Sequence, residues 1–159
     1  MTHPTSPCPQ MLTYRPPRIA LALLATAGAL QLTLSAAWTL PQLPSSLGGA
    51  GLLAALGFLI MLRAWWLFRL QKTAVCPTAH TSVLITDDIY NLTRNPMYLG
   101  ILLMLLGTAI GSGGLFFYIA TLLFFLIIDR VFCPYEEAKL AHAFSDEFRR
   151  YRNRVRRWL

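Results

Sequence analysis

The 159-residue chain is 55% hydrophobic and only 13% charged, with a formal net charge of +7. A soluble domain of this size needs a charged surface around its core, so the composition excludes an ordinary soluble domain and indicates an integral membrane protein. The three cysteines and three histidines are scattered and lack the paired spacing of a metal site, and the glycine-rich motifs of soluble nucleotide-binding proteins are absent. We therefore expect no metal site.

The first part of the chain is proline-rich. Residues 1–17 carry five prolines among small polar residues, which predicts a disordered tail ahead of a single membrane domain at 18–159. The uncharged run at 19–40 is long enough to cross a bilayer. A cleavable signal peptide is the alternative, but this run exceeds a normal signal core, which favours a retained span. A second apolar run at 50–70 predicts a second span.

Tryptophans and arginines gather near the end of the second predicted span. Trp65, Trp66 and Arg69 suit a membrane interface, where aromatic rings and long cationic side chains reach the headgroups. Arg63 lies deepest in the span, and snorkelling to the headgroups is favoured there over pairing inside the protein. A polar loop at 71–95 follows.

The apolar stretch that follows this loop is broken only by the Gly/Ser turn at 111–114. Its halves, 96–110 and 115–128, have about fifteen residues each, or roughly 22 Å of helix. A short helical hairpin is therefore expected. Small residues at Gly48, Gly49, Gly51 and Gly57 of the second span could pack within the bundle or against a neighbour, which leaves the oligomeric state open.

The last part of the chain, 134–158, alternates apolar residues at helical spacing with many arginines. This pattern predicts a basic amphipathic helix that lies on an anionic leaflet or packs against the membrane bundle. Nucleic-acid binding is a much weaker interpretation in a membrane chain. The turns at 41–49 and 111–114 carry no charge, so the positive-inside rule places both termini and the 71–95 loop in the cytoplasm. The predicted fold is all-α, with four transmembrane helices and a cytoplasmic C-terminal helix.

The stretch at 93–100, Thr-Arg-Asn-Pro-Met-Tyr-Leu-Gly, marks the cytoplasmic start of the third predicted span. Proline is tolerated best at the first position of a helix and asparagine is a preferred N-cap, so we expect a helix that begins at Pro96 and is capped by Asn95. The free N–H groups and the positive end of the helix dipole lie beside Arg94. Such a helix start attracts anions.

Two adjacent glutamates, Glu136 and Glu137, follow the last predicted span on the same membrane face. Adjacent carboxylates at a membrane edge need compensation, which Arg94, Arg130 or a bound cation could supply. A structural cluster of salt bridges that clamps the helix ends is as well supported by this spacing as a binding site.

Together these motifs resemble a known family. The 93–100 motif is followed by a four-residue turn, then by Glu-Glu-x-x-Leu-x-x-x-Phe from residue 136 and Tyr-x-x-x-Val-x-Arg-Trp from residue 151. This order resembles the isoprenylcysteine carboxyl methyltransferase and phospholipid methyltransferase superfamily. Two sites depart from its usual pattern: Asp88-Ile89-Tyr90 stands where Gly-x-Tyr is usual, and Ser145 to Phe148 replace Gly-x-x-Tyr. Asn95 also replaces the histidine of the eukaryotic enzymes.

The resemblance implies an S-adenosylmethionine-dependent membrane methyltransferase, with the cofactor at the cytoplasmic end of the last helices. The catalytic positions that it implies are Arg94, Tyr98 and Glu137. The implied cofactor-binding positions are Tyr90, Arg94, Asn95, Pro96, Tyr98, Gly100, Glu136 and Glu137. The acceptor would be a lipid or other hydrophobic small molecule.

Elementary chemistry agrees with this implication. Arg94 and the N–H groups after Asn95 suit the cofactor carboxylate, and Glu136 or Glu137 suits its ammonium or ribose hydroxyls. A carboxylate acceptor needs no base, whereas an amine must first lose a proton, for which Glu136, Glu137 or Asp88 is available. The alternative function is a non-catalytic membrane adaptor that binds a partner or anionic lipid through its basic C-terminal helix.

Overall fold

The computed structural model describes residues 16–39, 41–70 and 83–159. Predictions for the tail before residue 16 and for residues 71–82 of the polar loop lie outside the described residues. The elements, in chain order, are α1 (Pro16–Ala37), α2 (Leu47–Leu70), the 3₁₀ turn η2 (Asp88–Asn91), α3 (Pro96–Ser112), α4 (Leu115–Ile127), the π-helical turn η3 (Ile128–Phe132) and α5 (Cys133–Arg154). Apart from an isolated bridge between Gln42 and Gly114, the described residues contain no β-structure. The predicted all-α class is confirmed.

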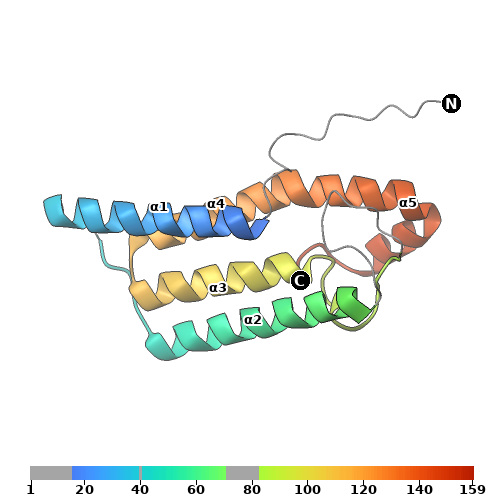
Figure 1. Ribbon diagram of the computed structural model, residues 1–159, viewed down its shortest axis with the longest axis horizontal. Coiled ribbons are helices and arrows are strands. Elements are labelled where there is room, and N and C mark those ends of the chain that lie inside the picture. The colour runs from blue at the N-terminus through green and yellow to red at the C-terminus, as the bar shows by residue number, and fades with distance from the viewer. Residues whose placement is uncertain (1–15, 40, 71–82) are drawn as a thin grey trace.

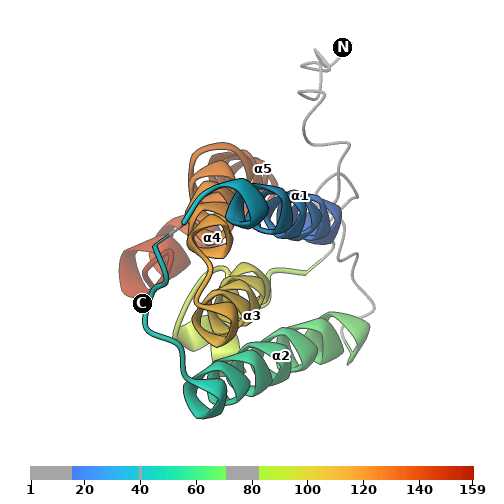
Figure 2. The ribbon, with the colours of Figure 1, turned by 90° about the vertical axis from the view of Figure 1, so that its left-hand side faces the viewer.

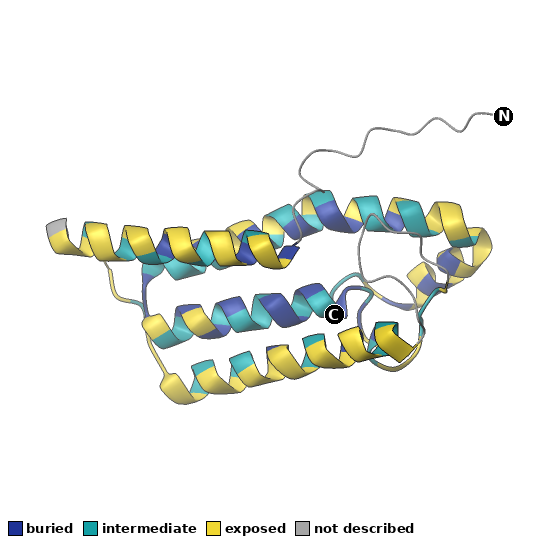
Figure 3. Cartoon of the chain, viewed as in Figure 1, coloured by how far each residue is buried: buried dark blue, intermediate teal, exposed yellow. Residues whose placement is uncertain are grey.

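Four long helices lie side by side, and α5 continues beyond their end (Figure 1). The packing order is α1–α4–α3–α2, which the end-on view makes visible (Figure 2). The burial pattern distinguishes the inner helices from the outer ones: α2 is mostly exposed, while α3 carries a row of buried residues (Figure 3). Apolar side chains that face outward on such a bundle suit a lipid environment.

Three helical stretches are long and apolar enough to cross a membrane: 16–36, 47–70, and the continuous run that begins at Leu115. The remaining helix, α3, is apolar but shorter, with 17 residues or about 25 Å of helix. The turn between α3 and α4 lies where the sequence predicted it. It is closed by Gly113, whose φ of 63° lies in the left-handed region, and by a hydrogen bond from the Leu43 N–H to the Gly113 carbonyl oxygen (2.9 Å).

Glycines allow α2 and α3 to approach closely. A Cβ atom built on Gly57 of α2 would lie 2.5 Å from the Gly100 carbonyl oxygen, and one on Gly100 would lie 2.5 Å from the Gly57 carbonyl oxygen. By contrast, Gly48 and Gly51 have nothing within 4 Å of such an atom. Gly57 therefore packs within the bundle, in the way small residues bring membrane helices together.

The C-terminal helix is shorter and more bent than predicted. It ends at Arg154 rather than at residue 158, and it folds back sharply at Ser145 (Figure 1). Its apolar face, including Phe148 and Tyr151, packs against Ala64 of α2. Of the two arrangements that the amphipathic pattern left open, this contact supports packing against the membrane bundle.

Among the described residues, two other than glycine have a positive φ: Asp88 (58°) and Ser145 (39°, with ψ −109°). Both occupy positions where the family resemblance has glycine. Glycine adopts this region without the steric penalty that a Cβ imposes, so Asp88 and Ser145 carry backbone strain that glycine would avoid.

We expect Ser145→Gly to stabilise the protein by about 1 kcal/mol, because it removes a Cβ from a left-handed position. Thermal unfolding in lipid nanodiscs measures the change. The matched control is Ala143→Gly, which places glycine in the same helix, at a position where helical φ and ψ are kept. It should destabilise by about 1 kcal/mol. A lower melting temperature for Ser145→Gly would contradict the proposed strain.

Candidate functional site

The 93–95 segment enters α3 as predicted, since the helix begins at Pro96, but its cap differs from the expectation. Asn95 occupies the N-cap position without a side-chain capping hydrogen bond. Its Nδ2 instead donates to the carbonyl oxygen of Arg157 (3.2 Å). The side chain of Asn95 therefore does not cap the N-terminus of α3.

Residues 155–158, which follow α5, return to the start of α3. The Arg94 N–H donates to the Arg156 carbonyl oxygen (3.0 Å), and Thr93 Oγ1 donates to the Arg157 carbonyl oxygen (2.9 Å). Val155 is buried beside α5. The chain segment that was predicted to be the last turn of a helix is thus an extended strap against the 93–95 segment.

The side chains at this junction form a charged network, which we call the arginine–glutamate cluster; it contains Arg94, Asp129, Glu137, Arg157 and Trp158. Arg157 donates to both Glu137 oxygens, from Nε to Oε1 (2.9 Å) and from Nη2 to Oε2 (3.0 Å). Its Nη1 donates to Asp129 Oδ1 (3.0 Å), which also accepts from Trp158 Nε1 (2.9 Å). Arg94 Nη2 lies 3.3 Å from Glu137 Oε1. The hydrogen bonds to Glu137 also raise the pKa of Arg157.

Arg94 is buried but incompletely paired. Its side chain is 10% exposed, and its Nε and Nη1 atoms have no hydrogen-bond partner among the residues that the structure describes. Burial lowers the pKa of Arg94, while the charge of Glu137 opposes that shift. An arginine stays protonated under such conditions. A buried cation with two unpaired donors is costly unless an anion completes it.

A second carboxylate lies next to this cluster. Tyr98 of α3 donates its hydroxyl hydrogen to Glu136 Oε1 of α5 (2.5 Å). The Tyr98 ring also contacts Phe132 edge-on, with centroids 6.5 Å apart. The predicted site residues Arg94, Tyr98 and the two glutamates therefore converge where α3 meets α5.

Three other predicted site residues have packing roles. Tyr90 is buried, contacts the Phe68 ring edge-on (5.9 Å), and accepts a hydrogen bond from the Tyr151 hydroxyl at its carbonyl oxygen (2.8 Å). Pro96 is fully buried at the start of α3. Gly100 faces α2, as described above, so its glycine is accounted for by helix packing. Their assignment to a cofactor site stays a prediction.

Arg63 differs from the expectation of an unpaired, snorkelling cation. It forms an ion pair with Asp88 of η2, including a hydrogen bond from its Nε to Oδ1 (3.3 Å). This contact lowers the pKa of the Asp88 carboxyl group. Asp88, one of the candidate bases, is thereby held as a carboxylate at the end of α2.

Sequence reasoning missed the contact of Glu137 with Arg157 of the strap and the hydrogen bond of Arg157 to Asp129 of η3. A regular amphipathic helix over 134–158 would put Arg157 on its polar face and Trp158 in its apolar stripe. Glu137 pairs with Arg94 and Arg157, whereas Arg130 lies 3.4 Å from Asp129. The signal for this contact in the sequence was the Val-x-Arg-Trp motif at 155–158. In the extended strap its side chains point in other directions than they would in a helix.

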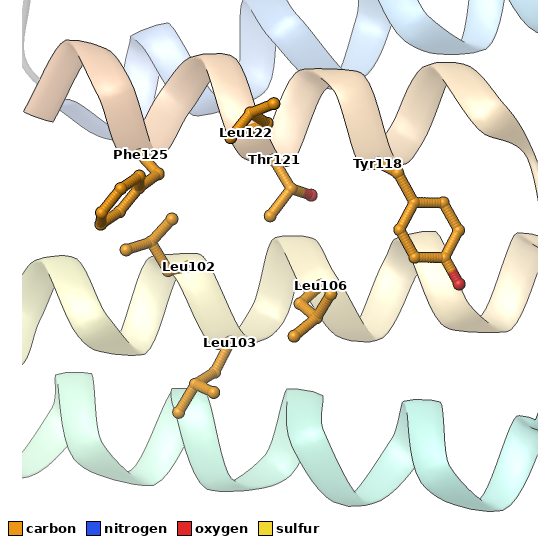
Figure 4. A pocket seen from close by; sticks show the side chains of 7 residues that line it. All are labelled: Leu102, Leu103, Leu106, Tyr118, Thr121, Leu122 and Phe125. Carbon is orange, nitrogen blue, oxygen red and sulfur yellow. The ribbon is translucent and has the colours of Figure 1, made fainter. Parts of the chain in front are cut away.

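An apolar groove of about 300 Å³ runs between α3 and α4 (Figure 4). Its lining consists of Leu102, Leu103, Leu106, Tyr118, Thr121, Leu122 and Phe125. At one end, the Phe125 ring contacts the ring of Trp158, with centroids 5.3 Å apart. Since Trp158 belongs to the arginine–glutamate cluster, this ring contact joins the lining of the groove to the charged network.

Comparisons with known proteins find one matching family and two similar sequences. Residues 44–147 match the phospholipid methyltransferase family. A 63-residue stretch, 40% of this chain, is 40% identical to the whole of an uncharacterized protein of Haemophilus influenzae. A 76-residue stretch, 46% of this chain, is 37% identical to 31% of a protein-S-isoprenylcysteine O-methyltransferase of Schizosaccharomyces pombe. No solved structure matches the chain. The family match covers more than half of the sequence, and the chain belongs to the phospholipid methyltransferase family.

Proposed function

We propose that this protein transfers a methyl group from S-adenosylmethionine to a hydrophobic or lipid-like acceptor at the cytoplasmic face of a membrane. The observation that carries the proposal is the buried Arg94 guanidinium with two unpaired nitrogen atoms. A carboxylate is the natural partner of such a group, and the cofactor has one. Family membership and the likeness to the yeast enzyme support the same reaction class.

Different residues of the site would bind different groups of the cofactor. S-adenosylmethionine, when bound, supplies an electrophilic methyl group, so no protein nucleophile is needed. Arg94 and the N–H groups that begin α3 would hold its carboxylate. Glu137 already has two arginine partners, so Glu136, beside Tyr98, is the better carboxylate for its ammonium. These contacts would contribute by alignment and by exclusion of water.

The groove between α3 and α4 is the site that we propose for the apolar part of the acceptor (Figure 4). It lies between two apolar helices, and Phe125 at one end contacts Trp158. An acceptor chain in this groove would enter sideways from the bilayer and bring its reactive end toward the charged network. We also propose four crossings with both termini in the cytoplasm, on the basis of the uncharged turns at 41–49 and 111–114.

The test is calorimetric titration of S-adenosylmethionine into protein in lipid nanodiscs, followed by labelled-methyl incorporation into a lipid extract. Saturable binding with label recovered in the apolar fraction is the expected result. A folded protein that binds no cofactor, but copurifies with a stoichiometric partner, would instead favour the adaptor. The exposed arginines of α5 would then be the surface to examine, namely Arg149, Arg150, Arg152 and Arg154.

Filling the groove should weaken binding of the acceptor and leave binding of the cofactor unchanged. Leu106→Trp places an indole among the lining side chains, so we expect KM for the lipid acceptor to rise about tenfold while Kd for S-adenosylmethionine stays unchanged. The matched control is Leu123→Trp, on an exposed position of α4 outside the lining. Equal KM values for the two variants would show that the acceptor binds elsewhere.

A further inference from the structure

The arrangement around Glu137 raises the question of why Arg94 keeps unpaired donors beside a carboxylate. We propose that Arg157 is a positioning residue: it holds the Glu137 carboxylate so that the buried Arg94 guanidinium stays available to an incoming anion. This inference rests on the proposed function, because the anion in question is the carboxylate of S-adenosylmethionine.

The two arginines share Glu137 unequally. Arg157 engages both oxygens through Nε and Nη2, at 2.9 and 3.0 Å, in the two-pronged geometry that makes an arginine–carboxylate pair strong. Arg94 reaches only Oε1, from one nitrogen, at 3.3 Å. Glu137 is therefore oriented by Arg157 and contacts Arg94 through Oε1 alone.

Arg157 is itself fixed from two other parts of the chain. Its Nη1 donates to the carboxylate oxygen Oδ1 (3.0 Å) and to the carbonyl oxygen (3.3 Å) of Asp129 in η3. Its own carbonyl oxygen accepts hydrogen bonds from Thr93 and Asn95. Asp129 is held in turn by Trp158. Arg157 is thus anchored by Asp129 through its guanidinium and by Thr93 and Asn95 through its backbone.

Without Arg157, Glu137 has one cationic partner left in the cluster. A carboxylate and a guanidinium at this distance and degree of burial form a two-pronged pair when nothing restrains them. Glu137 would then occupy donors of Arg94 that the ligand needs. Binding of the ligand carboxylate would weaken, and the geometry of methyl transfer would stay unchanged.

The test compares Kd values for S-adenosylmethionine among wild type, Arg157→Gln and the double variant Arg157→Gln/Glu137→Gln, by calorimetry in nanodiscs. We expect Arg157→Gln to raise Kd at least tenfold. The double variant should recover most of that loss, because a neutral amide does not compete for Arg94. A purely structural role for Arg157 predicts the opposite, a further loss in the double variant. Arg150→Gln, an equal charge change on an exposed position of α5, is the control.

Two further measurements keep the test decisive. Decarboxylated S-adenosylmethionine lacks the group that Arg94 is proposed to bind, so its Kd should be the same in wild type and Arg157→Gln. If Arg157→Gln does not fold, Arg157→Lys takes its place in the comparison. Lysine keeps the cation but loses the two-pronged contact, so its Kd should be higher than that of wild type. No recovery in the double variant, or equal weakening of both ligands, would overturn this inference alone. A folded wild type that binds no cofactor would overturn the proposed function and this inference with it.

Discussion

Arg94→Gln is expected to raise the Kd for S-adenosylmethionine at least 100-fold without lowering the melting temperature. Each charge-assisted hydrogen bond to the ligand contributes about 1.5–3 kcal/mol, and two nitrogen atoms of Arg94 are free to make one. Stability should hold, because the side chain has one long contact, to Glu137, and carries a desolvation cost that the neutral amide reduces. The backbone hydrogen bond from residue 94 to the strap is unaffected by the substitution.

Calorimetry and thermal unfolding on the same nanodisc preparation measure both quantities. Arg150→Gln removes an equal charge from an exposed position of α5 and should bind the cofactor as wild type does. The combination of lost binding and kept stability is what distinguishes a ligand-binding arginine from a structural one. Unchanged Kd in Arg94→Gln would refute the assignment of Arg94 to the cofactor, and a large fall in melting temperature would show that the cluster is a structural clamp.

Gly100→Ala is expected to destabilise the protein by about 1–3 kcal/mol, and Gly100→Leu to prevent its accumulation in the folded state. A methyl group at this position would lie 2.5 Å from the Gly57 carbonyl oxygen and 2.9 Å from the Cβ of Met61. Helix backbone cannot shift aside as a flexible side chain can, so α2 and α3 must separate. Separation would lose the close packing between α2 and α3.

Gly51→Ala is the matched control, since it adds the same methyl group to α2 at a position with nothing within 4 Å. Alanine has the higher helix propensity, so this control should be neutral or stabilising. Thermal unfolding of the three proteins in one lipid composition gives the comparison. Equal melting temperatures for the two alanine variants would show that the helices do not meet at Gly100.

Local patterns in the sequence were enough to locate the helices. Proline at position 96, the Gly/Ser turn after α3 and the apolar runs each act within a few residues, and the helices begin and end close to where these patterns placed them. Gly57 was among the glycines named as candidate packing residues, but its partner was not identified. Gly100 lies 43 positions after Gly57, and nothing local to either residue indicates the other.

The least predictable part of the site was the strap. Its position depends on the reversal of α5 at Ser145, where a left-handed conformation occurs in a residue that does not favour it. A regular helix through residue 158 would have satisfied the same apolar periodicity, and it would have directed Arg157 away from Glu137. The motif Val-x-Arg-Trp carried the information, but only as part of a family resemblance.

The strap also sets an order of events during synthesis. Thr93 and Arg157 are hydrogen-bonded across 64 positions, so the residue that orients Glu137 is made long after the residues at the start of α3. While residues 155–158 are still inside the ribosome, Glu137 and Arg94 lack their third member. Cofactor affinity should therefore arise only when residues 155–158 have left the ribosome, rather than gradually as the helices enter the bilayer.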